Sequence, residues 1–154
     1  MYTLLIVAHS WLRWIVLVAG LLAFARALAG RSSRRTWGPG DEAPGRWYTI
    51  LFDVQVLLGL LLYVWASPIT MAARQNMAAA MGYSATRFWL IEHALGMIVA
   101  LALAHVGRAR VRRALTDRDR FGKAALFYGL SVLIALAATP WPGLPYGRAL
   151  FRLP

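Results

Sequence analysis

Two histidines occupy corresponding positions in two hydrophobic segments, and their chemistry is the most distinctive feature of the chain. His9 lies about seven residues into the first segment and His93 about five residues into the third, which gives depths of roughly 10 and 8 Å at about 1.5 Å per residue. Ionisable side chains are costly inside a bilayer, so their presence there indicates a function. Two imidazoles facing each other across a helix bundle are what a b-type haem needs as axial ligands. We therefore predict one haem b with His9 and His93 as the metal ligands; structural histidines, or a non-haem metal or proton site, are the alternatives.

Two charged residues adjoin these histidines and are further candidates for the site. Arg13 lies one turn deeper than His9 on nearly the same face, where an unpaired guanidinium would be costly. Its candidate partners are Asp53, Glu92 and a carboxylate of the cofactor, and we favour the two side chains. Glu92 adjoins His93 but points about 100° away from it, so it could carry protons near a quinone or pair with Arg13.

Small and amide residues on the same helix faces complete the predicted cofactor site. Gln55 and Gly59 are four residues apart and share a face of the second segment. Gln55 could bond a ligand or a neighbouring helix, and we favour the helix. Gly96 lies about 60° from His93 in a stripe of mostly small residues. Such a stripe leaves room for a flat macrocycle, although ordinary close helix packing is the commoner explanation.

The third histidine is not expected to bind a cofactor. His105 lies about 18 Å deeper than His93 and has no histidine partner at that depth. A second haem held by two histidines of this chain is therefore not predicted. Asp53, early in the second segment, could pair with His105 instead.

Composition and charge place the chain in a membrane. Of its 154 residues 60% are hydrophobic and 15% are charged, and there is no cysteine, which excludes disulfides and thiolate sites. Twelve basic residues lie in or beside the first and third connections, against four in the second connection and the C-terminal tail. This is the positive-inside distribution, so the net charge of +11 indicates a membrane topology and contacts with lipid, and no nucleic-acid partner.

Hydropathy predicts an all-α integral membrane protein, an up-down bundle of four transmembrane helices in one domain. The basic connections face the cytoplasm, so both termini lie outside, and the location is the inner membrane of a bacterium. Residues 30–45 are rich in glycine, serine and proline and are expected to be irregular. Residues 71–82 predict a short helix in the outer interface, between the second and third spans. The predicted spans are residues 2–28, 47–66, 88–106 and 121–139.

Short motifs in a fixed order resemble those of the four-span bacterial membrane proteins commonly labelled "cytochrome B". The resemblance covers nearly the whole chain, and its positions include those selected by depth. It implies a single four-helix membrane domain and points to the same five residues, His9, Arg13, Gln55, Glu92 and His93. The motifs are His9–Trp14, Gln55–Tyr63 with the following Ser67-Pro68, Arg87-Phe88, Glu92-His93, Gly107-Arg108 and Pro140–Pro142.

The leading interpretation is an electron-transfer protein and not a stand-alone enzyme. A single six-coordinate haem would exchange electrons with a membrane quinone or with a redox protein at the outer face. A second interpretation is a cofactor-free accessory subunit of a larger membrane complex, or a homodimer, whose polar groups serve assembly. A third is a quinone-reactive or metal-dependent membrane enzyme that uses His9, Glu92 and His93.

Overall fold

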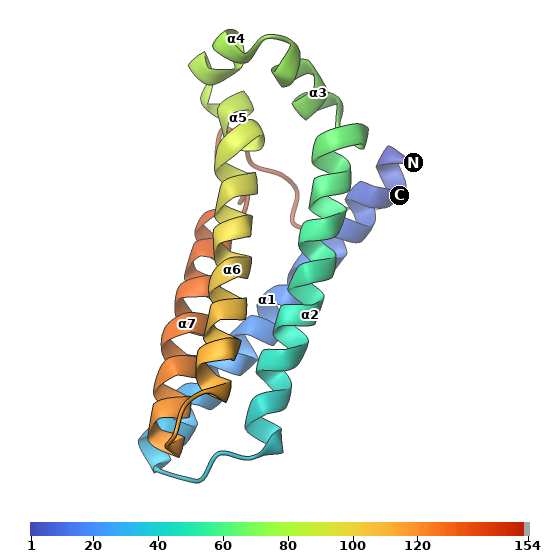
Figure 1. Ribbon diagram of the computed structural model, residues 1–154. Helices are drawn as coiled ribbons and strands as arrows, with labels where there is room; N and C mark the ends of the chain where they lie inside the picture. The colour runs from blue at the N-terminus through green and yellow to red at the C-terminus, as the bar shows by residue number, and fades with distance from the viewer. Residues whose placement is uncertain (153–154) are drawn as a thin grey trace.

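The computed structural model describes residues 1–152, and these residues form helices and no β-strand. Four helical stretches are long and apolar enough to cross a membrane, as the hydropathy predicts. The chain is therefore a multi-pass membrane protein of the all-α class. The four stretches are Tyr2–Ser33, Pro39–Ala66, Ser84–Arg112 and Asp117–Ala137 (Figure 1).

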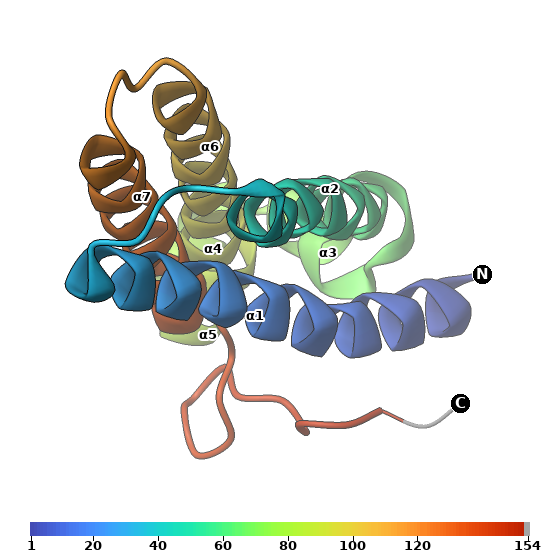
Figure 2. The ribbon, with the colours of Figure 1, turned by 90° about the horizontal axis from the view of Figure 1, so that it is seen from below.

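The long helices form an up-down bundle in which each contacts two others. α1 (Tyr2–Ser33) packs on α2 (Pro39–Leu61) and on α7 (Asp117–Ala137), and α6 (His93–Arg112) packs on α2 and α7. α1 is tilted, so it lies close to α7 at the end that carries the basic connections and diverges from it toward the N-terminus (Figures 1 and 2). The divergence opens the bundle at the end where His9 and His93 lie.

The first connection is much shorter than the sequence predicts. α1 continues to Ser33 and α2 begins at Pro39, so the expectation of an irregular segment over residues 30–45 is wrong except for residues 34–38. Arg34 ends α1 in the left-handed conformation, with φ 52°. Pro39 lacks an N–H, but the first position of a helix does not need one. The prolines and glycines here therefore begin a helix instead of breaking one.

Asp41 ties this connection together at the N-terminus of α2. Its carboxylate accepts hydrogen bonds from the backbone N–H of Gly38 (3.2 Å) and from the guanidinium groups of Arg26 (3.3 Å) and Arg35. The hydrogen bond to the carboxylate raises the pKa of Arg35 above its usual value. An acidic side chain in the first helical turn also matches the helix dipole. The turn between α1 and α2 is thus held by one buried carboxylate.

The second connection contains three short helices where the sequence predicts one over residues 71–82. They are α3 (Pro68–Gln75), α4 (Met77–Gly82) and α5 (Ser84–Arg87). Asn76 separates the first two because its side chain accepts the N–H of Ala79 and so caps the start of α4. Residues 71–82 are thus helical apart from Asn76, as their composition indicates, but the division into separate helices was not predicted.

Two wider helical turns border the open end of the bundle. α2 runs on through the π-helical turn η1 (Leu62–Ala66), and α5 joins α6 through a second one, η2 (Phe88–Glu92). Such turns insert an extra residue into the helix, so the side chains that follow are rotated relative to an unbroken helix. The turn η2 directly precedes His93 and helps to set its direction.

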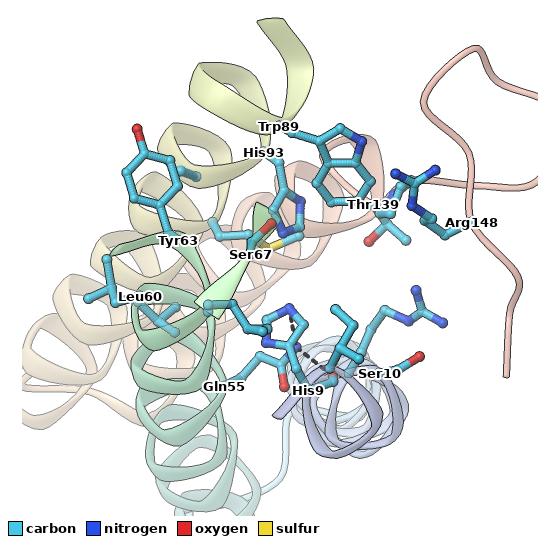
Figure 3. Close-up of a pocket in the computed structure, with 18 of the residues that line it drawn as sticks. His9, Ser10, Gln55, Leu60, Tyr63, Ser67, Trp89, His93, Thr139 and Arg148 are labelled. Atoms are coloured by element: carbon cyan, nitrogen blue, oxygen red, sulfur yellow. Dashed lines mark hydrogen bonds between the residues drawn. The ribbon is translucent and has the colours of Figure 1, made fainter. Parts of the chain in front are cut away.

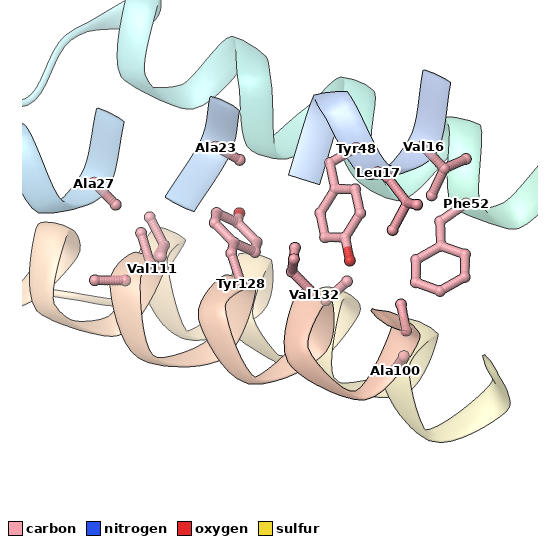
Figure 4. Packing of buried hydrophobic residues seen from close by; sticks show 14 residues of the cluster. Val16, Leu17, Ala23, Ala27, Tyr48, Phe52, Ala100, Val111, Tyr128 and Val132 are labelled. Carbon is pink, nitrogen blue, oxygen red and sulfur yellow. The ribbon is translucent and has the colours of Figure 1, made fainter. Parts of the chain in front are cut away.

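The apolar core fills the half of the bundle near the basic connections (Figure 4). Tyr48 and Phe52 of α2 and Val16 of α1 meet small residues of α6 and α7, among them Ala100. The Tyr48 hydroxyl and Ser131 Oγ are hydrogen-bonded at 2.6 Å, and Ser131 Oγ donates to the Ala100 carbonyl at 2.6 Å. The buried hydroxyls of Tyr48 and Ser131 therefore satisfy each other and the Ala100 carbonyl.

Candidate functional site

A cavity of about 140 Å³ lies where α1 and α2 diverge from α6 and α7. Its walls come from α1, α2 with η1, η2 with α6, the end of α7 and the C-terminal segment after α7. The walls are mostly apolar, and the cavity is partly open at its side. A cavity of this size holds one small ring.

The two histidines predicted to share a cofactor face each other across this cavity. The ring centroids of His9 on α1 and His93 on α6 are 6.3 Å apart, and the ring planes are inclined by 73° (Figure 3). Two imidazole nitrogens bound to one metal at about 2.0 Å each place the ring centres roughly 6 Å apart. The observed separation is therefore compatible with two ligands of one metal ion.

His93 is held in the orientation typical of a metal ligand. Its Nδ1 lies 2.8 Å from the carbonyl oxygen of Ala138. A carbonyl can only accept, so Nδ1 carries the hydrogen and Nε2 of the neutral ring keeps its lone pair. A bond of this kind orients metal-binding histidines and fixes their tautomer. The rings of Phe88 and Trp89, with centroids 5.8 and 5.4 Å from that of His93, fix the imidazole from the sides.

Gln55 orients His9. As predicted, its side chain bonds a neighbouring helix. The Gln55 amide nitrogen donates to the His9 carbonyl oxygen (3.0 Å) and lies 3.3 Å from His9 Nε2. The other ring nitrogen, Nδ1, is buried and has no partner. An amide nitrogen can only donate, so His9 Nε2 accepts this bond and Nδ1 carries the hydrogen of the neutral ring. The amide thus links α2 to α1 beside the cavity and leaves the buried Nδ1–H of His9 without an acceptor.

Unpaired buried polar atoms are concentrated around the cavity. Buried polar atoms in proteins nearly always have a partner, so each exception needs an explanation. Among residues 1–152, five buried side-chain nitrogen or oxygen atoms lack one, and four of the five belong to residues that line the cavity. A bound polar or metal-containing ligand would satisfy them. The four are His9 Nδ1, Arg13 Nε, Gln55 Oε1 and Trp89 Nε1.

Arg13 lines the cavity, but its expected ion pair is not formed. Its guanidinium donates to the carbonyl oxygen of Leu150, in the C-terminal segment. Glu92 pairs instead with Arg87 (2.7 Å), and Asp53 is bonded to His105 (2.8 Å). Both favoured partners are therefore taken, and the choice of a side-chain partner for Arg13 was wrong.

The pair formed by Asp53 and His105 lies outside the cavity. The two side chains are 49% and 47% exposed on the surface of α2 and α6, among apolar residues. The suggestion that Asp53 pairs with His105 is confirmed. His105 is thus engaged elsewhere and does not contribute to the cavity.

The remaining predicted residues divide between the cavity and the helix contacts. Gly59 lines the cavity, whereas Glu92 and Gly96 do not. A Cβ atom on Gly96 would lie 2.7 Å from that of Ala138, so this glycine permits close packing of α6 on α7. The structure therefore brings five of the seven predicted residues to one cavity: His9, Arg13, Gln55, Gly59 and His93.

We expect Gly59→Val to weaken cofactor binding without removing a ligand. A Cβ atom at this position would lie 3.1 Å from Cε1 of His9, and a branched side chain would push the imidazole out of place. The cost is about 1–3 kcal/mol, or roughly 5- to 150-fold in affinity, measured by titrating the purified protein with haem. Gly82→Val is the control, because nothing lies within 4 Å of a Cβ atom there. Equal affinities for the two variants would contradict this role of Gly59.

The sequence allows Arg148 to meet acidic groups of a cofactor, but nothing in its spacing selects it, and Arg152 was not identified. Arg148 and Arg152 line the cavity, although the segment that carries them follows two prolines and has no helical periodicity. Trp89 also lines it, and only a hydrophobic pattern marked that residue. A cluster of arginines opposite buried histidines is visible only once the segment is folded back over the bundle.

The metal-binding potential of the site rests on the pair of histidines. In the described part of the chain, no group of three or more histidine, aspartate or glutamate side chains is placed to hold a metal ion. Two imidazoles suit a metal that arrives with ligands of its own, as iron does in a porphyrin.

Comparison of the chain with protein-family models, with curated proteins and with solved structures finds no match. The resemblance to the "cytochrome B" proteins therefore stays a prediction, and the argument for a function depends on the geometry of the cavity.

Proposed function

We propose that this protein is a b-type membrane cytochrome that binds one haem between His9 and His93. The observation that carries the proposal is the 6.3 Å separation of the two ring centroids across a cavity. The unpaired polar atoms around the cavity support it, because they indicate a ligand.

The donor set fits a haem, and the cavity admits one if it widens. Two neutral imidazoles are the usual axial ligands of a six-coordinate haem that transfers electrons. A tetrapyrrole exceeds the space of about 140 Å³, so side chains at the open side must move. Met97 lines the cavity and is only partly buried, and its unbranched side chain adapts readily.

The residues of the chain would hold, orient and shield the group. The Ala138 carbonyl keeps the Nδ1 proton on His93 and so directs the lone pair of Nε2 toward a metal. Gln55 would hold α1 through the carbonyl of His9, and its bond to His9 Nε2 would have to open for that nitrogen to bind a metal. Trp89 and Phe88 exclude water from the side of His93. The bound haem would supply a one-electron iron couple.

The charge distribution supports a topology with the cavity near the outer face of a bacterial inner membrane. The basic residues gather at the turns between α1 and α2 and between α6 and α7, at the end opposite the cavity (Figure 1). The positive-inside rule assigns that end to the cytoplasm, which puts both termini outside and α3, α4 and α5 at the outer interface. The electron partners are then a quinone, which reaches the cavity from the lipid, or a redox protein at the outer surface.

A reduced-minus-oxidised absorption spectrum tests the proposal. The protein purified in detergent from haem-replete cells is expected to show the bands of a six-coordinate b-type haem. Carbon monoxide is expected to leave the reduced spectrum unchanged, because both axial positions are filled. Absence of haem bands, both as purified and after addition of haem, would refute the proposal in favour of a cofactor-free subunit.

A further inference from the structure

Positive charge lines one side of the cavity without any acidic counterpart. Three arginines line it, Arg13 from α1 and Arg148 and Arg152 from the C-terminal segment, and none of its described lining residues is an aspartate or glutamate. None of the ion pairs formed within residues 1–152 includes these three arginines. Three guanidinium groups gathered beside a mostly apolar cavity repel one another, so an anion between them would be stabilised.

The donors of these arginines are only partly used. Arg13 donates one terminal N–H to the Leu150 carbonyl, and its buried Nε has no partner. Arg148 bonds only the adjacent Gly147 carbonyl, at 3.3 Å, and its guanidinium carbon lies 5.0 Å from the ring centroid of Trp89. The Trp89 Nε1 is a further buried donor without a partner. Donors from three elements are therefore left free beside one cavity.

The C-terminal segment is fixed in the position that brings two of these arginines to the cavity. Trp11 Nε1 donates to the Arg152 carbonyl (2.9 Å) and Trp14 Nε1 to the Leu150 carbonyl (3.0 Å), so the segment runs alongside α1 (Figure 2). The ring of Tyr146 stacks on Phe88 with centroids 3.6 Å apart. These contacts use backbone carbonyls and an aromatic ring, so the guanidinium groups of Arg148 and Arg152 stay available.

We propose that Arg13, Arg148 and Arg152 form an anion subsite that receives carboxylate groups at one edge of the ligand in the cavity. This inference rests on the proposed function and adds the chemistry of the ligand's periphery. Figure 3 shows Arg148 to one side of the gap between the imidazoles and the apolar Leu60 and the ring of Tyr63 to the other. A flat ligand with acidic groups on one edge and an apolar opposite edge matches this arrangement. Guanidinium groups suit carboxylates because they form paired, charge-assisted hydrogen bonds.

The test compares iron-free protoporphyrin IX with its dimethyl ester, in which methylation of the two carboxylates removes both charges. Neither has a metal, so binding does not depend on coordination by histidine. Dissociation constants are measured by quenching of tryptophan fluorescence, for the full-length protein in neutral detergent. Partition of a probe into micelles does not depend on the protein variant. The ratio of the dissociation constants for the diacid and the diester can therefore be compared between variants, and a change in this ratio reflects a change in the protein.

The double variant Arg148→Gln/Arg152→Gln is expected to lose about tenfold in its preference for the diacid, with an unchanged affinity for the diester. Arg74→Gln is the control, because it removes a charge at the same end of the molecule from a residue outside the cavity lining, and it is expected to keep the wild-type ratio. A double variant with the wild-type ratio, or a wild-type protein that binds neither probe, overturns the subsite.

The subsite and the haem can fail separately. Suppose that the protein prefers the diacid to the diester but shows no spectrum of haem ligated by two histidines. This result would support the subsite and refute the cytochrome. A haem ligated by His9 and His93 with no effect of the arginine substitutions on the ratio would do the reverse.

Discussion

Replacing His93 with alanine is expected to lower the affinity for haem at least about 100-fold, the largest effect of any single substitution in the cavity. The change removes a metal ligand together with the hydrogen bond that orients it, and outer-sphere orientation alone is worth about 10- to 100-fold in metal affinity. The protein purified from haem-replete cells should then lack the bands of a six-coordinate haem. Titration of the purified apoprotein with haem measures the loss.

His9→Ala provides an independent view of the same pair. It leaves His93 and the Ala138 carbonyl intact, so any haem retained should have one protein ligand and an open position. Carbon monoxide should then alter the reduced spectrum, unlike that of the wild-type protein.

His105→Ala is the matched control for both variants. It removes the third histidine of the chain from a site on the surface of α6, away from the cavity. Its haem content and spectrum are expected to equal those of the wild type. Thermal unfolding followed by circular dichroism shows whether each variant is folded. Full haem retention in folded His9→Ala and His93→Ala variants would mean that the imidazoles are not the ligands.

The similar depth of the two histidines could be predicted because helix geometry determines depth. An α-helix rises a constant distance per residue, so sequence position inside an apolar span gives depth, and spans running in the same direction place equal depths side by side. The sequence predicted His9 and His93 at a similar depth, and in the structure their ring centroids are 6.3 Å apart. The bond from Gln55 to a neighbouring helix was also predicted, but not that His9 would be its partner.

The periphery of the cavity could not be predicted, because irregular backbone forms it. The C-terminal segment has no periodic pattern, yet its Leu150 carbonyl takes the Arg13 donor that the sequence assigned to a carboxylate. The turns η1 and η2 change the register of the helices that border the cavity, and nothing in composition marks such turns. Pairing and register depend on tertiary contacts that a single sequence does not specify.

The close approach of three helices at Gly20 leads to the second large effect, on the fold. A Cβ atom at Gly20 of α1 would lie 2.7 Å from Cε2 of Tyr48 on α2 and 2.7 Å from Cγ2 of Val132 on α7. Both neighbours are buried, and Tyr48 is fixed by its hydrogen bond to Ser131, so neither can move without disturbing the core. Gly20 therefore sets the spacing of α1 from two helices at once.

Gly20→Leu is expected to lower the free energy of unfolding by about 3 kcal/mol, the upper part of the usual range for overpacking. For a chain of this length the melting temperature should fall by roughly 6–12 °C, measured by circular dichroism in detergent. Gly82→Leu is the control, since a Cβ atom there meets nothing within 4 Å, and it should change stability by less than about 0.5 kcal/mol. Because α1 carries His9 and Arg13, a shift of this helix should also weaken haem binding. Equal melting temperatures for the two variants would show that α1 moves freely against α2 and α7. The packing of α1 would then no longer support a fixed separation of the two imidazoles.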